Sequence, residues 1–238
     1  MSIRNSLLRT YFARRMKAID RFRRHPDQVQ AEMFRQLIAR GADTEFGRRH
    51  GVAKHLTPEA FAARVGVQDY ESFKPYIERM LAGEKNVAAP GRVTLFARSS
   101  GTTSDRSKFI PVTRESVWWN HTLGMRDVAA VYASAKPQTK IFDGKTLTLG
   151  GSYVRENGAL IGDLSAVLIS QTPFWSGWFR APKMETALIP DFDRKIEGIC
   201  RECTREKITA FAGVPSWNLV LMRRVLEYTC LLYTSPSP

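Results

Sequence analysis

The hydroxyl-rich stretch RSSGTTSDRSKFIP, residues 98–111, holds the side chains of this chain that are best suited to chemistry. The six of interest are small, hydroxylated or cationic: Ser99, Ser100, Gly101, Thr102, Thr103 and Lys108. In such a turn, backbone N–H groups can form a concave nest for phosphate oxygens, and the hydroxyls add donors. A lysine supplies a compact positive charge for the β- and γ-phosphates. The same composition is also typical of a solvated surface loop, and composition alone favours that alternative.

Two well-known nucleotide-binding patterns do not fit this stretch. A P-loop requires a second glycine before the lysine and a hydroxyl residue after it, whereas Phe109 follows Lys108. A dinucleotide-binding fingerprint requires three spaced glycines, and residues 98–111 contain only Gly101. A phosphate site here would therefore belong to a different class.

The neighbouring segments predict that the stretch joins two strands. Residues 92–97, RVTLFA, are β-branched and aromatic, and they predict a strand that leads directly into it. Residues 109–113, FIPVT, predict a second extended segment, and Thr113 can cap a long helix that carries Trp118 and Trp119. We expect one of these tryptophans in the core and the other in the wall of a pocket.

Helices and strands alternate along the rest of the chain after a helical first ninety residues. Helical patterns occupy residues 1–24, 25–41, a short segment from Thr57, 70–83, 191–207 and 216–228. Strand patterns occupy residues 145–154, 159–170 and 208–213, the last of these with the composition of a buried strand. This order predicts an α/β fold class, a β-sheet covered by helices with a helical N-terminal layer.

Composition places the chain among ordinary globular proteins. Of its 238 residues, 43% are hydrophobic and 25% are charged. No apolar run approaches the ~20 residues that a membrane helix needs, and no signal-peptide pattern is present, so a cytoplasmic location is expected. Cys200 and Cys203 form a lone C-x-x-C without a second pair of ligands for zinc, which predicts ordinary reduced thiols and no metal site.

The first 24 residues concentrate positive charge. They hold eight basic side chains against one acid, Asp20, so they carry +7 of the chain's net charge of +13. Apolar residues recur at three- and four-residue spacing, which predicts one amphipathic helix with a basic outer face. Three alternatives stay open: a helix docked on the domain, contact with an anionic membrane surface or nucleic acid, and a targeting presequence.

Several motifs, in order, carry a resemblance to a known family. They read TEFGRRHG, DYESFKPYIERMLAGEKN, SSGTTSDRSKFIPVT and FAGVPSW, and the similarity extends from about Ala31 to Tyr228. In this order the motifs resemble those of the auxin-responsive (Gretchen-Hagen-type) acyl acid–amido synthetases, in their bacterial branch. The pattern S-S-G-T-T-x-x-x-x-K is similar to the first ATP-binding motif of the wider acyl-adenylate-forming superfamily.

The resemblance implies a two-step ligase that uses ATP and Mg²⁺. A small carboxylic acid would attack the α-phosphate and release pyrophosphate, and an amine or amino acid would then displace AMP to form an amide. Ser99, Ser100, Gly101, Thr102 and Thr103 would line the β- and γ-phosphates, with Lys108 as the cation. Asp105 and Arg106 depart from the small residues often found in relatives, which places the geometry of the loop tip in question. An acyl-CoA ligase is the alternative within enzymes.

The motif GVPSWN is a second candidate site. It follows the strand predicted at 208–213 and opens a helix, so it lies at the carboxyl end of a sheet, where α/β proteins bind ligands. The resemblance implies that Val214 and Trp217 contact the carboxylic acid, and core packing of the tryptophan is the alternative.

The last nine residues, 230–238, differ from the rest. CLLYTSPSP carries no charge, interrupts a helical pattern, and reads as the translation of a DNA-library adaptor. The sequence thus predicts a helical layer at 1–90 and an incomplete ATP-binding α/β domain at 91–229, both in the same structural domain, followed by a non-native tail at 230–238. Relatives of this family are roughly twice as long, which implies that the adenine-, ribose- and Mg²⁺-binding parts are absent and that the fragment is inactive.

Overall fold

The computed structural model describes residues 3–99 and 107–230, which form a mixed α/β fold in two compact units. We call residues 15–124 and 154–161 the loop unit, because they contain the two ends of the hydroxyl-rich loop. We call residues 1–14, 125–153 and 162–238 the parallel-sheet unit. In the described part of the chain, no helix is long and apolar enough to span a membrane.

Helices make up most of the loop unit. They are α2 (Met16–Arg24), α3 (Pro26–Gly41), α4 (Glu45–Arg49), α5 (Pro58–Val65), α6 (Tyr70–Leu81), α7 (Arg114–Ser116) and the π-helical η1 (Val117–Thr122). Four of them begin at a residue whose side chain accepts a hydrogen bond from the backbone N–H three residues later: Thr44, Thr57, Asp69 and Thr113. The N-caps predicted at Thr57 and Thr113 are confirmed.

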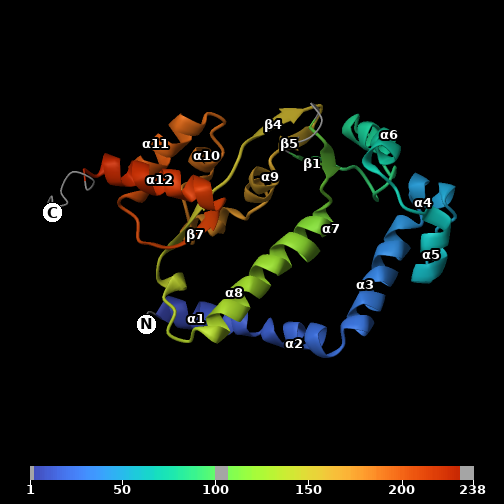
Figure 1. Ribbon diagram of the computed structural model, residues 1–238, viewed down its shortest axis with the longest axis horizontal. Coiled ribbons are helices and arrows are strands. Elements are labelled where there is room, and N and C mark those ends of the chain that lie inside the picture. The colour runs from blue at the N-terminus through green and yellow to red at the C-terminus, as the bar shows by residue number, and fades with distance from the viewer. Residues whose placement is uncertain (1–2, 100–106, 231–238) are drawn as a thin grey trace. The chain divides into compact units, whose positions relative to one another are not determined.

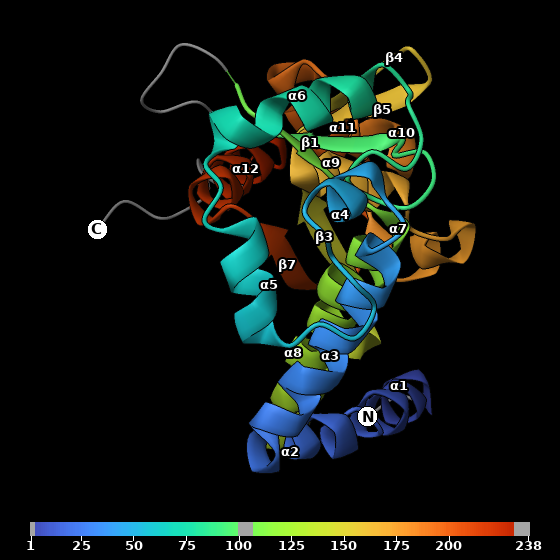
Figure 2. The same cartoon turned by 90° about the vertical axis from the view of Figure 1, so that its right-hand side faces the viewer.

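The sheet of the loop unit has the strand order β2-β1-β5-β4. Its strands are β1 (Leu95–Arg98), β2 (Phe109–Pro111), β4 (Tyr153–Glu156) and β5 (Ala159–Gly162). β5 lies between β1 and β4 (Figure 1), although more than forty residues separate it from β1 in sequence. β1 and β2 are antiparallel, with Arg98 opposite Phe109. Helix α6 covers this sheet (Figure 2), because Ile77 and Met80 pack with Phe96 in one buried cluster.

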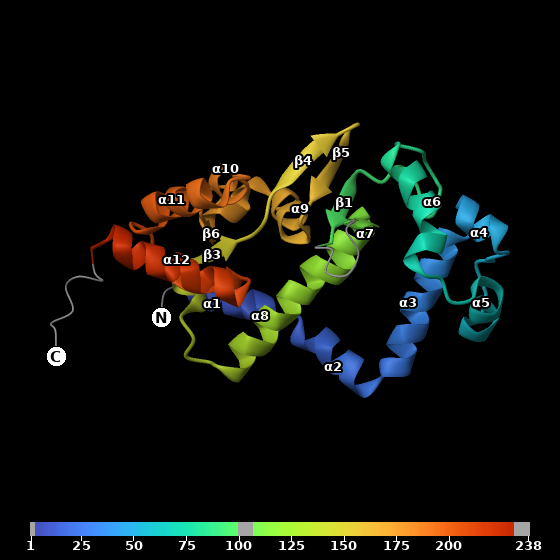
Figure 3. The ribbon, with the colours of Figure 1, turned by 45° about the horizontal axis from the view of Figure 1, so that its top comes forward.

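The parallel-sheet unit is built around three parallel strands. In the order β6-β3-β7, these are β6 (Arg180–Ala181), β3 (Lys145–Leu149) and β7 (Ile208–Gly213). Its helices are α1 (Ile3–Ala13), α8 (Leu123–Ala135, which starts in the loop unit), η2 (Ile141–Asp143), α9 (Leu164–Ser170), η3 (Phe174–Trp178), α10 (Met184–Ala187), α11 (Phe192–Cys203) and α12 (Pro215–Tyr228). Helices α11 and α12 contact each other and the sheet (Figure 3), and Ile199, Leu221 and Leu149 form its buried core.

The prediction of one helix over residues 1–24 is wrong. The chain turns at Arg14 and Arg15, which divides it into α1 in one unit and α2 in the other. Arg4 donates from Nε to the carbonyl oxygen of Phe142 at 2.9 Å and from Nη2 to that of Gly144 at 3.0 Å. For α1 these contacts confirm the docked-helix alternative, since part of its basic face points into the unit.

Three further predictions fail for physical reasons. The strand pattern at 159–170 ends at Gly162 and is followed by α9, because short apolar runs fit a buried strand and a buried helix equally well. Trp118 and Trp119 are both about half exposed, 48% and 45%, so neither is a core residue. β7 is a strand as predicted, yet it is not buried: Phe211 is 49% exposed.

Candidate functional site

Hydrogen bonds between Ser99 and Lys108 join the two ends of the hydroxyl-rich loop, and we call this pair of residues, with the adjoining ends of β1 and β2, the neck. Ser99 donates its backbone N–H to the carbonyl oxygen of Lys108 at 2.9 Å. The Lys108 N–H is 3.3 Å from Oγ of Ser99, to which it donates. The structure therefore brings together two of the six residues predicted for this site, and the other four, Ser100, Gly101, Thr102 and Thr103, lie outside the described residues. Because Ser99 Oγ accepts at the neck, its O–H can still donate toward the loop.

Tyr70, the first residue of α6, fixes the second strand of the neck. Its hydroxyl oxygen accepts a hydrogen bond from the N–H of Phe109 at 2.9 Å. The ammonium of Lys108 lies 5.1 Å from the centroid of the Tyr70 ring, within reach of a cation–π interaction. Sequence reasoning missed Tyr70, and the only signal was its place inside the motif DYESF, because the partners are 38 and 39 residues away.

Asp69 adds a negative charge beside this cation. Ser72 donates both its hydroxyl and its N–H to the Asp69 carboxylate, which lowers the pKa of Asp69, and the charge of Lys108 lowers it further. The exposed Lys108 ammonium, at the end of the loop, thus lies near both the aromatic ring of Tyr70 and the carboxylate of Asp69. This arrangement can hold a positive charge at the point where the loop could receive phosphate oxygens.

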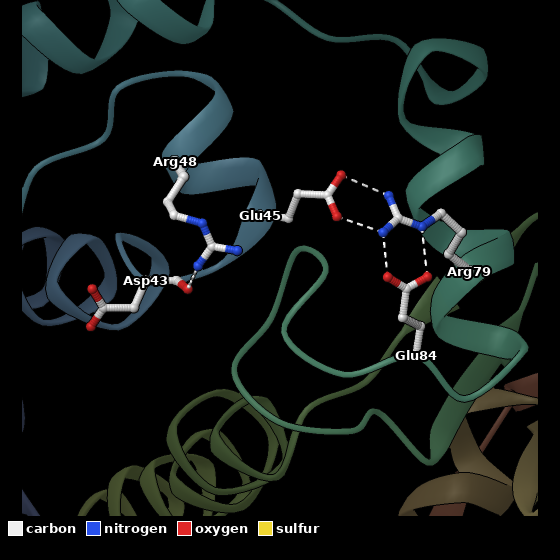
Figure 4. A network of polar contacts seen from close by, with 5 residues as sticks. All are labelled: Asp43, Glu45, Arg48, Arg79 and Glu84. Carbon is white, nitrogen blue, oxygen red and sulfur yellow. Dashed lines mark hydrogen bonds and ion pairs between the residues drawn. The ribbon is translucent and has the colours of Figure 1, made fainter.

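A planar ion-pair network holds α6 against α4 (Figure 4). Arg79 Nη1 donates to Glu45 at 2.7 Å and Nε donates to Glu84 at 2.7 Å, while Nη2 donates to both carboxylates. Arg79 lowers the pKa of Glu45 and of Glu84, and they in turn raise the pKa of Arg79. The network is exposed, but two bidentate pairs on one guanidinium give it a fixed geometry. Arg79 and Tyr70 lie on the same helix, α6, so a network that fixes α6 also fixes the position of Tyr70.

This network predicts an acid-sensitive attachment of α6. A carboxylate whose folded pKa is depressed stabilises the fold above its ordinary pKa, and this contribution is lost as the pH falls through the folded value. The ordinary value of Glu45 and Glu84 is 4.5, so the loss belongs below that pH. We expect Glu45→Gln/Glu84→Gln to lower the melting temperature at about pH 7, and this difference to narrow as the pH falls below 4.5. A melting-temperature difference that does not change with pH would contradict the assignment.

The second candidate site lies at the carboxyl edge of the parallel sheet. Leu149, the last residue of β3, is in register with Gly213, the last residue of β7. Val214 and Trp217 follow at the start of α12 and are 47% and 36% exposed. The Trp217 ring packs edge-on against Phe192 with a centroid distance of 5.7 Å. The tryptophan therefore combines packing with an exposed surface at the carboxyl edge of the sheet, the edge at which α/β proteins bind ligands.

Reactive cysteines and clusters of side chains that bind metal ions would be two other kinds of site among the described residues. Burial is the main cause that raises the pKa of Cys203, to about 11, and it also raises the pKa of Cys200. Both thiols are buried and form no disulfide, and their raised pKa values favour the less reactive thiol form. Among the described residues, no cluster of three His, Cys, Asp or Glu side chains could hold a metal ion.

Comparison with known families settles the relationship of the chain. A family model described as the GH3 family N-terminal domain matches residues 15–198. The chain belongs to the GH3 family. The resemblance inferred from the motifs is confirmed at this level.

Two curated GH3 relatives match less than half of the chain. A probable indole-3-acetic acid-amido synthetase GH3.2 of Oryza sativa subsp. japonica is 34% identical over 106 residues, 44% of this chain and 17% of the relative. The indole-3-acetic acid-amido synthetase GH3.3 of Arabidopsis thaliana is 29% identical over 103 residues, 43% of this chain and 17% of the relative. The match thus spans under a fifth of these relatives' length.

A solved structure shares the fold. That of the GH3.15 acyl acid amido synthetase has a TM-score of 0.70 and 18% sequence identity, covering 91% of this chain and 39% of that chain. At this identity the likeness shows the fold alone, and it supports the α/β fold class predicted from the sequence.

Proposed function

We propose that this GH3 chain is part of an ATP-dependent ligase that adenylates a small carboxylic acid and joins it to an amine or amino acid. The observation that carries the proposal is the β1–β2 neck, which sets Ser99 beside Lys108 at the ends of the S-S-G-T-T-x-x-x-x-K motif. The family match adds support, because the relatives named above are amido synthetases. The names of these relatives make indole-3-acetic acid one candidate for the acid.

The proposed first step forms an acyl-adenylate. A carboxylate oxygen attacks the α-phosphorus of ATP, the bond to the bridging α–β oxygen breaks, and pyrophosphate leaves with that electron pair. Ser99, Ser100, Gly101, Thr102 and Thr103 would donate hydrogen bonds to the β- and γ-phosphates, and Lys108 would stabilise the charge that builds on them. Mg²⁺, bound together with ATP, would neutralise charge on the phosphates, and no step is assigned to it.

The proposed second step forms the amide. An amine nitrogen attacks the acyl carbon, AMP leaves, and the nitrogen loses a proton. Val214 and Trp217 would contact the carboxylic acid at the carboxyl edge of the parallel sheet. A cytoplasmic location and membership of the bacterial branch remain predictions that accompany this function.

Exposed apolar surface on β7 and α12 supports the further proposal that more protein completes the fold. Within the described residues β7 pairs only with β3, so its other edge is open. Eight large apolar side chains are exposed on these two elements and the residue between them: Phe211, Val214, Trp217, Leu219, Val220, Met222, Leu226 and Tyr228. An exposed patch of this kind marks an interaction surface. We therefore propose that residues 91–229 are an incomplete ATP-binding α/β domain that also includes the helical layer at 1–90, that 230–238 are not native, and that the 238-residue chain is inactive.

Exchange of labelled pyrophosphate into ATP tests both proposals. We expect no carboxylate-dependent exchange by the 238-residue chain, and exchange by a protein encoded by the reading frame recovered across codon 229. Exchange by the 238-residue chain would contradict its incompleteness. Absence of exchange in the recovered protein with a panel of acids would contradict the ligase itself. Products formed with CoA rather than amines would establish the acyl-CoA ligase alternative.

A further inference from the structure

A buried lysine is hydrogen-bonded to the turn that follows β3. Lys195, on α11, is only 2% exposed. Its Nζ donates to the carbonyl oxygen of Gly150 at 2.7 Å and to that of Gly151 at 2.6 Å. Burial lowers the pKa of Lys195, and the charge of Asp163 acts in the opposite direction. Lysine is rarely buried unless it is paired, and here its partners are two backbone carbonyls 44 and 45 residues away.

The other side of the same turn is fixed by residues near the start of α9. Gly151 donates its N–H to Oγ of Ser165 at 3.0 Å, and Ser152 donates its N–H to Oδ2 of Asp163 at 3.2 Å. The Asp163 N–H returns a bond to the carbonyl oxygen of Ser152 at 3.1 Å. A Cβ added at Gly151 would lie 1.8 Å from Oδ2 of Asp163, so only glycine fits this approach. The turn is therefore held from two sides, in one conformation.

This turn adjoins the residues proposed to contact the carboxylic acid. Leu149 and Gly213 are in register on parallel strands, so the segments that follow them emerge at the same edge of the sheet. One segment is the turn at Gly150 and Gly151, and the other leads to Val214 and α12. Ligands of α/β sheets bind outside the carboxyl ends of the strands. A molecule seated against Val214 would meet the turn as its neighbouring wall.

We propose that Lys195 is a positioning residue of a carboxylic-acid subsite at this edge: it holds the Gly150–Gly151 turn in the conformation that forms the subsite wall. The inference rests on the proposed function and deepens it. Lys195 does not touch the acid; it acts through the two carbonyl groups. Without its ammonium, those buried carbonyls lose their partners, and the turn must open to find water.

The test compares Lys195→Met with Arg194→Met in the 238-residue chain. Arg194 precedes Lys195 on α11 and is exposed, so its variant removes the same charge without touching the turn. We expect Lys195→Met to speed hydrogen exchange at the amides of residues 150–152 at least about tenfold, with residues 145–149 still protected. Benzoate, used as the probe acid in an NMR titration, should bind about tenfold more weakly, a loss of about 1.4 kcal/mol. Arg194→Met should leave both readouts unchanged.

Each outcome supports or overturns the inference. Faster exchange spread evenly over β3, α11 and the turn would show a merely structural role and would overturn it. Unchanged benzoate binding by Lys195→Met would overturn this inference while leaving the proposed function in place. If the unaltered chain does not bind benzoate, the same comparison is made in the protein of the recovered reading frame, and failure of that protein to bind benzoate would contradict the proposed acid site, and the inference with it. If Lys195→Met does not fold, Lys195→Gln, which keeps one donor, should show the same selective loss at a smaller size.

Discussion

Replacing Lys108 with Met is expected to weaken ATP binding by the 238-residue chain at least about tenfold, or about 1.4 kcal/mol. Methionine keeps most of the length of the side chain, so the variant removes mainly the positive charge, and with it the cation–π interaction with the Tyr70 ring. Backbone bonds between Ser99 and Lys108 close the neck, and a change of side chain leaves those bonds in place. Isothermal titration calorimetry with ATP measures the loss directly.

Lys85→Met is the matched control for this experiment. Lys85 is exposed in the same unit, and its only described link is a backbone bridge to Arg92. Both variants therefore lower the net charge by one, and only one of them changes the loop neck. An equal loss of affinity in both would indicate general attraction of ATP to a basic protein. Unchanged affinity in Lys108→Met would remove Lys108 from the proposed phosphate site.

Local rules were enough to predict the neck and its frame. Strand-forming residues on both sides of a glycine- and hydroxyl-rich stretch predict a strand–loop–strand arrangement, and β1 and β2 form one. Thr57 and Thr113 are helix caps because a threonine oxygen ahead of a helical segment satisfies a backbone N–H. In each case the interacting groups are close in sequence or share one hairpin.

Interactions between distant segments could not be predicted in this way. Tyr70 meets Phe109 across 39 residues, and no periodicity within α6 shows that its hydroxyl has a backbone partner elsewhere. Lys195 is harder still, because a lysine in an amphipathic pattern predicts a solvent-facing position, whereas this one is buried against two carbonyls. The error at β7 has a related cause. Its apolar composition predicts burial, but burial depends on a neighbour that the described residues do not provide.

Gly47→Ala is expected to destabilise the loop unit by about 3 kcal/mol or more, the upper range for overpacking a tight site. Gly47 is buried in α4, and a Cβ there would lie 2.1 Å from the carbonyl oxygen of Gly41 and 2.9 Å from that of Ala42. The Gly41 oxygen cannot retreat easily, because Thr44 donates to it twice, from its N–H at 3.0 Å and from its hydroxyl at 2.6 Å. The added Cβ would thus clash with a backbone oxygen that two hydrogen bonds hold in place, and not with a flexible side chain that could move away.

Gly41→Ala is the matched control for this prediction, because it adds the same methyl group to a neighbouring glycine that has room for it. Gly41 ends α3, and a Cβ at this position would meet no atom within 4 Å. Alanine favours the helix by up to about 1 kcal/mol over glycine, so this variant should be as stable as the unaltered chain or more so. Thermal unfolding followed by circular dichroism should show Gly47→Ala about 10 °C lower and Gly41→Ala unchanged or higher. Equal melting temperatures for the two variants would mean that the α3–α4 corner relaxes around an added methyl group, and the glycine of the TEFGRRHG motif would then need another explanation.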